Sequence, residues 1–217
     1  MAFKIEMVGD SHARINFYGV VGYDIQDSEF IEQIDALGDV ATMELRLNSP
    51  GGDVFQGLAI YNRLREHPAK KTAIVDGAAL SVMSVIMLAA DEREVRKGGR
   101  VMVHEPHGVA VGRAADFRAY AEQMDVTTSE VADIYAERTN WKRDEAIASM
   151  ENETWLSATQ ALEAGFATRE SKSLAIAAYF DANVMSMYKH VPLDMHSKLP
   201  SSKEYVRRRL RLAGINA

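Results

Sequence analysis

The 217-residue sequence predicts an α/β fold, and three observations lead to this prediction. Segments of strand character alternate with amphipathic helices as far as Ala90, which is typical of parallel sheets with right-handed crossovers. A longer helical pattern at 114–138 then interrupts the alternation. The composition, 47% hydrophobic and 26% charged, is that of an ordinary globular protein. We therefore expect one α/β core with a long helical excursion.

The individual elements follow from the spacing of apolar residues. Met43, Leu45 and Leu47 alternate with polar residues, as in a half-buried strand. We expect strands at 13–21, 43–48, 71–76, 92–96, 100–104 and 174–180. Apolar residues three and four positions apart indicate helices, with Asp53 as the N-cap of one and Gly165 just after another. We expect these helices at 28–37, 54–66, 114–138, 144–150 and 157–164.

The bulk properties exclude several classes of protein. A net charge of −6 disfavours nonspecific nucleic-acid binding, and the absence of cysteine excludes disulfides and thiolate metal sites. The amino-terminal residues lack the apolar region of a signal peptide, and the apolar run 78–90 is too short to span a bilayer. We expect a cytoplasmic protein with no membrane contact. Periodicity ends after Asn183, so we interpret 183–217 as a flexible tail whose basic segment, 205–212, could instead bind a partner or be removed.

The stretch from Val75 to Ala90 carries the strongest chemical signal. It begins as the end of a strand and becomes an apolar run of helix length, in which Ser81 and Ser84 are the only hydroxyl residues. A hydroxyl in such surroundings must find a partner or serve a reaction, because burying it unpaired costs about 1–3 kcal/mol. We expect Ser81 to be a nucleophile at the start of the helix, with a simple helix cap as the alternative.

A serine nucleophile needs a base, an acid that orients the base, and N–H donors for the oxyanion. His104 is the first candidate base because it ends an apolar strand, with His107 as a rival and His67 expected to be solvated. Gly51 and Gly52 could offer backbone N–H groups at close approach, or form a plain turn. The Gly-x-Ser-x-Gly, Walker and His-Glu-x-x-His motifs are absent, which disfavours an α/β-hydrolase, an ATPase and a zinc protease.

The order of these motifs along the chain resembles that of a known protein family. Four segments resemble the ClpP family of self-compartmentalised serine peptidases, over about Ala13 to Thr168: Asn48-Ser-Pro-Gly-Gly52, Gly77-Ala-Ala-Leu-Ser81, Val101-Met-Val-His104-Glu-Pro106 and Thr154-Trp-Leu-Ser-Ala158. Finer features resemble the phage ClpP-like head maturation (prohead) proteases: Phe55-Gln-Gly-Leu-Ala-Ile-Tyr-Asn62, the Ser81 and Ser84 pair, and Asn152-Glu-Thr-Trp155.

The resemblance implies roles for particular residues. It makes Ser81 the nucleophile and His104 the general base, with the N–H groups of Gly52 and Val82 as the oxyanion hole. Glu153 stands where the family has the aspartate of the triad, and Glu151 is the alternative if the register shifts. No metal and no cofactor are implied.

The resemblance also implies a fold and a setting. The fold would be a crotonase-like spiral of βαβ units within residues 1–182, with a projecting helical handle at about 105–140. Subunits would form homo-oligomeric rings that stack handle to handle and cleave polypeptides without an ATPase of their own. Substrates would be capsid and scaffold precursors, and the protein's own tail, in the host cytoplasm or inside the procapsid.

Three other readings remain open from the residues. A crotonase-fold CoA-ester enzyme would share the spiral and the paired oxyanion N–H groups. A non-catalytic oligomeric assembly protein would keep the fold alone. A serine–lysine dyad would use Lys71 or Lys97 in place of a histidine, although neither has an evident catalytic context.

Overall fold

The computed structural model describes residues 3–174, 185–192 and 195. The chain divides into two compact units, Met1–Ala178 and Tyr179–Ala217, and the first contains every element considered below. The strand expected at 174–180 lies outside the described residues beyond Leu174, as does the basic segment 205–212. The expected domain boundary near residue 182 stays a prediction.

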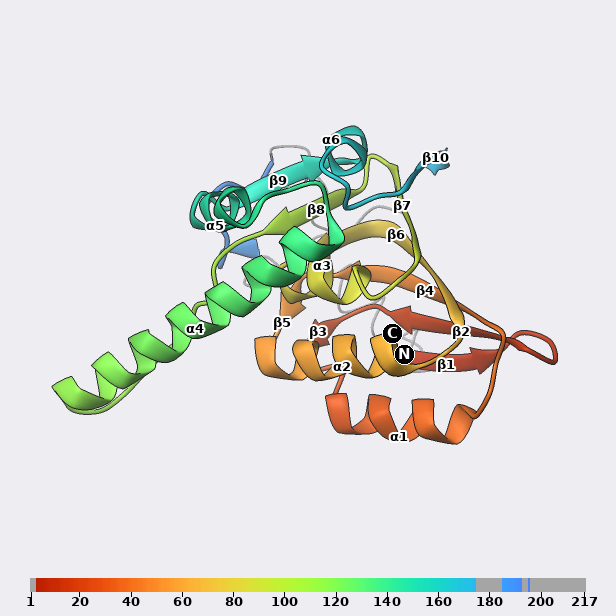
Figure 1. Ribbon diagram of the computed structural model, residues 1–217, viewed down its shortest axis with the longest axis horizontal. Coiled ribbons are helices and arrows are strands. Elements are labelled where there is room, and N and C mark those ends of the chain that lie inside the picture. The colour runs from red at the N-terminus through yellow and green to blue at the C-terminus, as the bar shows by residue number, and fades with distance from the viewer. Residues whose placement is uncertain (1–2, 175–184, 193–194, 196–217) are drawn as a thin grey trace, which may run out of the picture. The chain divides into compact units, whose positions relative to one another are not determined.

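A mixed sheet forms the centre of the first unit, so the predicted α/β class is confirmed (Figure 1). Its main path runs in the order β1 (Phe3–Met7), β2 (His12–Phe17), β4 (Thr42–Ser49), β6 (Lys70–Leu80), β7 (Glu92–Lys97) and β10 (Arg169–Leu174). β1 is antiparallel to β2, and the other neighbours are parallel. The carboxyl ends of the parallel strands therefore share one edge, where α/β proteins place functional groups.

The sheet branches along its longest strand, β6. Residues 72–75 of β6 pair with β7, whereas residues 78–80 pair with β8 (Arg100–Val103). β8 in turn pairs antiparallel with β9 (Thr154–Ser157). The strands β7 and β8 thus follow each other along the same side of β6. This branch brings the carboxyl end of β8 beside the carboxyl end of β6.

Helices pack on this sheet through apolar faces. Figure 1 shows α1 (Asp27–Leu37) and α2 (Val54–Glu66) side by side along one face. Phe3, Phe17 and Phe30 join β1, β2 and α1, with ring centroids 5.6–5.9 Å apart. The remaining helices are α3 (Val82–Met87), α4 (Ala114–Arg138), α5 (Arg143–Glu151) and α6 (Ala158–Glu163). Both capping predictions are confirmed: Asp53 Oδ1 accepts from Gln56 N at 2.9 Å, and Gly165 follows α6 with φ +82°.

The long helix α4 is buried over only part of its length. Val131 and Tyr135 in its carboxyl half are buried, whereas Phe117 in its amino half is 49% exposed. Figure 1 shows that amino half extending away from the sheet. No helix in the described part of the chain is long and apolar enough to cross a bilayer.

One local expectation was wrong, and some strands were not expected at all. The strand expected at 13–21 breaks after Phe17, and Val20–Val21 forms β3, which pairs with β5 (Gly51–Gly52). Neither β1 nor β9 was expected, and the four residues of β9 are too short to show a period. These additions matter because β5 and β9 both border the candidate site.

Candidate active site

Ser81 lies between β6 and α3 in an unusual backbone conformation. Its φ and ψ are 53° and −133°, a region that costs a non-glycine residue about 1–3 kcal/mol. It occupies the N-cap position of α3, but its side chain makes no capping hydrogen bond. The interpretation of Ser81 as a simple helix cap is therefore wrong, and its half-buried hydroxyl is directed to another partner.

That partner is His104, the first residue after β8. His104 Nε2 lies 2.8 Å from Ser81 Oγ, across 23 residues of sequence. The branch of the sheet creates this contact, because Ser81 N donates to Met102 O of β8 at 2.9 Å. His107 is exposed in the following loop, and its ring centroid is 5.0 Å from that of His104. The structure thus joins the two expected residues, Ser81 and His104, directly.

Glu153 lies beside His104 at the end of the β8–β9 ladder. Val103 pairs with Thr154, so the next position of the antiparallel register sets Glu153 opposite His104. Glu153 is buried and has φ 47°, and Trp155 Nε1 donates to its Oε1 at 3.2 Å. Glu151, the alternative acid, is exposed. Placement therefore favours Glu153, and its catalytic role stays a prediction.

Gly51, the first of the two glycines of β5, lies against the nucleophile. A Cβ on Gly51 would be 2.6 Å from both Leu80 O and Ser81 Cβ, so only glycine allows this approach. Gly52 follows it and is exposed. Val82 is the first residue of α3, where backbone N–H groups have no partner within the helix. Val82 directly follows Ser81 in the chain, and the roles of Gly52 and Val82 as oxyanion donors stay predictions.

Ser84 was singled out in the sequence, but its partner was not. Its fully buried hydroxyl donates to Ser81 O at 2.7 Å and lies 2.7 Å from Tyr135 OH of α4. Burial raises the pKa of Tyr135 above its usual value of 10.0, so this phenol stays protonated. The sequence indicates that a buried serine needs a hydrogen-bond partner. It does not indicate that this partner is Tyr135, 51 residues further along the chain.

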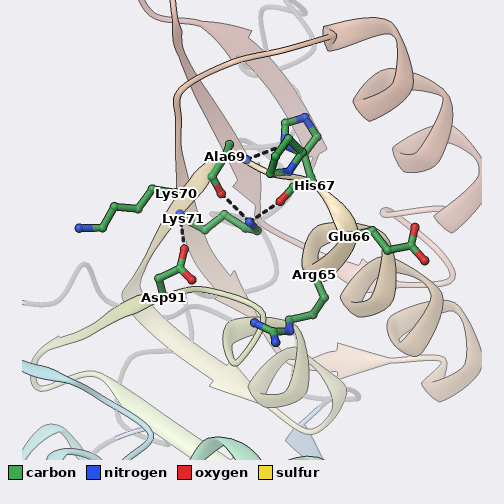
Figure 2. A pocket seen from close by; sticks show the side chains of 8 residues that line it. Arg65, Glu66, His67, Ala69, Lys70, Lys71 and Asp91 are labelled. Atoms are coloured by element: carbon green, nitrogen blue, oxygen red, sulfur yellow. Dashed lines mark hydrogen bonds between the residues drawn. The ribbon is translucent and has the colours of Figure 1, made fainter.

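The amino end of β6 has a different arrangement, shown in Figure 2. Lys71 lines an open pocket of about 430 Å³, and its Nζ donates to His67 O at 2.7 Å and Ala69 O at 2.5 Å. Burial lowers the pKa of Lys71. Because Lys71 and Ser81 are at opposite ends of β6, Lys71 cannot serve as the base of a serine–lysine dyad. Lys97 ends β7 with an exposed side chain.

The expectation of a solvated His67 was also wrong. His67 is buried, its Nδ1 accepts from Ala69 N at 3.1 Å, and its Nε2 lies 3.3 Å from Gly38 O. The end of α2 is covered by the turn after α1, which the local sequence around Pro68 does not reveal. His67 is therefore part of the structural end of β6.

The fold and the site together define a class of protein. A strained serine contacts an imidazole at the carboxyl edge of a parallel sheet, with glycine backbone beside it and a buried carboxylate opposite the imidazole. Activated serines of hydrolytic enzymes are arranged in this way.

The chain belongs to the Clp protease family, whose sequence model matches residues 12–169, nearly three quarters of the chain. It is 32% identical over 123 residues to the ATP-dependent Clp protease proteolytic subunit 1 of Chlamydia trachomatis serovar D. It is 30% identical over 138 residues to the ATP-dependent Clp protease proteolytic subunit of Bacteroides fragilis. These matches cover 55% and 63% of this chain, and 64% and 65% of the relatives' own lengths.

Proposed function

We propose that this protein is a serine endopeptidase with Ser81 as nucleophile and His104 as general base. The observation that carries the proposal is the 2.8 Å contact between Ser81 Oγ and His104 Nε2, at a serine held in a strained backbone conformation. Strain of this kind persists where the surrounding structure enforces it, and it gathers at active sites. Membership of the Clp protease family supports the same reaction class.

The proposed reaction is acyl transfer to serine followed by hydrolysis. Ser81 Oγ attacks the carbonyl carbon of the scissile peptide as its proton moves to His104 Nε2. The N–H groups of Val82 and Gly52 stabilise the resulting oxyanion. His104 then protonates the departing amine, and the C–N bond breaks. A water molecule, deprotonated by His104, then attacks the acyl-enzyme, the ester C–O bond breaks, and His104 returns the proton to Ser81 Oγ as the acid product leaves.

Glu153 completes the proposed triad. Its buried carboxylate would accept from His104 Nδ1 and stabilise the imidazolium that forms in each step. The register that sets Glu153 opposite His104 supports this role. The indole N–H of Trp155 holds Oε1, which restricts the longer glutamate side chain. Glutamate can therefore serve where the resemblance has aspartate.

The proposed setting is an assembly of several copies. The amino half of α4 and the preceding loop expose Phe117, Val109 and Val111, which are 49%, 91% and 94% exposed. Burying such side chains against a second copy is favourable, so we assign 105–140 as the handle of a stacked ring. The segments shared with the prohead proteases support capsid and scaffold precursors, and the protein's own tail, as substrates.

The experiment measures the intact mass of the purified protein before and after a fluorophosphonate probe. We expect one adduct on the wild type, none on Ser81→Ala, and a normal adduct on Ser28→Ala, which changes an exposed serine. A wild-type chain shorter than the Ser81→Ala chain would show self-processing. The absence of an adduct in every oligomeric state would contradict the proposal, and acyl-CoA binding would then favour the CoA-ester alternative.

A further inference from the structure

The carbonyl oxygen of Ser81 accepts two hydrogen bonds from one residue, Ser84. Ser84 N donates to Ser81 O at 2.8 Å, and Ser84 Oγ donates to the same oxygen at 2.7 Å. Ser84 is fully buried in the first turn of α3, so these bonds are shielded from water. The nucleophile's own carbonyl group is therefore held in one direction.

Tyr135 extends this chain of hydrogen bonds. A serine hydroxyl has one proton, and that of Ser84 is given to Ser81 O. The 2.7 Å contact between Ser84 Oγ and Tyr135 OH must then have the phenol as donor. The order of donation is Tyr135 to Ser84 to Ser81 O. Each bond polarises the next and strengthens the hold on the carbonyl.

The consequence follows from the planarity of the peptide bond. The Ser81 carbonyl and the Val82 N–H belong to one trans peptide unit and point in opposite directions, so fixing one fixes the other. We propose that Ser84 and Tyr135 are positioning residues that hold this peptide plane and aim the Val82 N–H at the oxyanion. The inference rests on the proposed function, in which Val82 is an oxyanion donor. Neither residue touches the substrate.

A second contact between the same helices supports this role. Arg138 lies one turn after Tyr135, and its Nε and Nη2 donate to Leu88 O and Ala90 O, each at 3.1 Å. The carboxyl end of α4 thus holds α3 at both of its ends. A helix fixed at two points cannot rotate to relieve the strain at Ser81, so the peptide plane keeps its direction.

The test compares Tyr135→Phe with Tyr23→Phe, the same chemical change at a tyrosine that is 79% exposed and lies outside α4. The measured quantity is the rate of fluorophosphonate labelling at Ser81, separated into maximal rate and half-saturating concentration. Removing an oxyanion donor outright costs about 10²–10³-fold in rate, so a poorly aimed donor should cost about tenfold. We expect that loss in the maximal rate of Tyr135→Phe only. The half-saturating concentration and the pH midpoint set by His104 should not change.

A second variant tests whether the two hydroxyls act as one chain. Ser84→Ala should lose as much as Tyr135→Phe or more, and the double variant should lose no more than Ser84→Ala alone. Thermal unfolding confirms that each variant is folded. Wild-type labelling rates in Tyr135→Phe, or a shifted pH midpoint, would overturn the inference and leave the proposed function intact. A wild type that is not labelled at Ser81 would overturn both.

Discussion

The two ends of β6 each carry a polar side chain with close hydrogen-bond partners, and they use it in opposite ways. At the carboxyl end, Ser81 is half-buried, has φ 53°, and contacts the side chain of His104. At the amino end, Lys71 is 4% exposed and its ammonium group donates to two main-chain carbonyls. One end directs its polar atom to a group that can transfer a proton. The other uses it to satisfy the backbone.

This difference separates the proposed reactive site from a structural one. A main-chain carbonyl cannot take up or release a proton near neutral pH, so the Lys71 contacts can only stabilise the turn between α2 and β6 (Figure 2). Strain also distinguishes the two ends. Among the non-glycine residues that the structure describes, positive φ occurs at Ser81 and Glu153, and both border His104. Variants at the two ends of β6 distinguish whether backbone strain accompanies reactivity and whether burial with backbone partners accompanies stability.

The largest expected effect belongs to Ser81→Gly. Loss of the hydroxyl should abolish fluorophosphonate labelling and lower peptidase activity at least 10³-fold. Glycine adopts positive φ at little cost, so the free energy of unfolding should rise by about 1 kcal/mol. Urea unfolding and labelling measure the two effects. Ser81→Ala is the control, because it also loses labelling but keeps the strain. Equal stability of the two variants would show that Ser81 stores no strain.

Glu153→Gln should have the next largest effect. The amide keeps the size of the side chain but removes the negative charge opposite His104, so we expect labelling to slow about 10²–10⁴-fold. Glu151→Gln, two residues earlier and exposed, should label within about twofold of the wild type. The labelling rate over time measures both. A larger loss in Glu151→Gln would mean that the register assigned to the triad is displaced.

Lys71→Met should affect stability without affecting activity. Two buried carbonyls lose their donor, so the free energy of unfolding should fall by about 1–3 kcal/mol, while labelling stays within about twofold. Lys70→Met is the matched control, because exposed Lys70 pairs with Glu92 at the surface, and its loss should cost less stability than the loss of Lys71. Slow labelling of Lys71→Met would contradict the separation of the two ends.

The pH dependence of the same variant has a definite sign. Burial lowers the pKa of Lys71, so the folded state binds this proton less tightly than the unfolded state does. Between that lowered pKa and the ordinary lysine pKa of 10.5, the unfolded state holds more protons, so wild-type stability should rise with pH across that window. Lys71→Met should lack this rise. Urea unfolding at several alkaline pH values provides the measurement.

Much of this contrast was predictable from sequence, because it depends on local patterns. Alternation predicted β4, and the position of His104 at the end of an apolar strand predicted its place at the sheet edge. Ser81 stood out as a hydroxyl at the start of an apolar helix. Each of these signals lies within a few residues of the feature that it predicts.

The remainder depends on contacts between distant segments. Residues 75–80 show no local feature that marks a change of pairing partner. In the structure, β6 nevertheless changes its neighbouring strand from β7 to β8 within this run. Ser84 meets Tyr135, and His67 is covered by the turn at Gly38, through packing that no local period encodes. Such contacts become visible only when the elements are assembled.

The smallest expected effect belongs to Tyr18→Phe, because Tyr18 contacts Asp76 in the middle of β6. Asp76 is fully buried, accepts from Tyr18 OH at 2.5 Å and Arg46 Nε at 2.8 Å, and lies 3.1 Å from Arg96 Nε. Burial, together with the hydrogen bond to the Asp76 carboxylate, raises the pKa of Tyr18 to about 12. The folded state therefore favours the protonated phenol more than the unfolded state does.

Tyr18→Phe should remove this alkaline contribution. Because the folded pKa lies above the ordinary value of 10.0, the stability that Tyr18 provides is complete below pH 10.0 and is lost as the pH rises through about 12. Ultraviolet titration should show one fewer late-ionising phenol in Tyr18→Phe than in the wild type, and Tyr23→Phe, at a side chain that is 79% exposed, is the matched control. Labelling at neutral pH should be normal in both. Slow labelling of Tyr18→Phe would mean that the Asp76 network governs Ser81, and that β6 does not separate stability from reactivity.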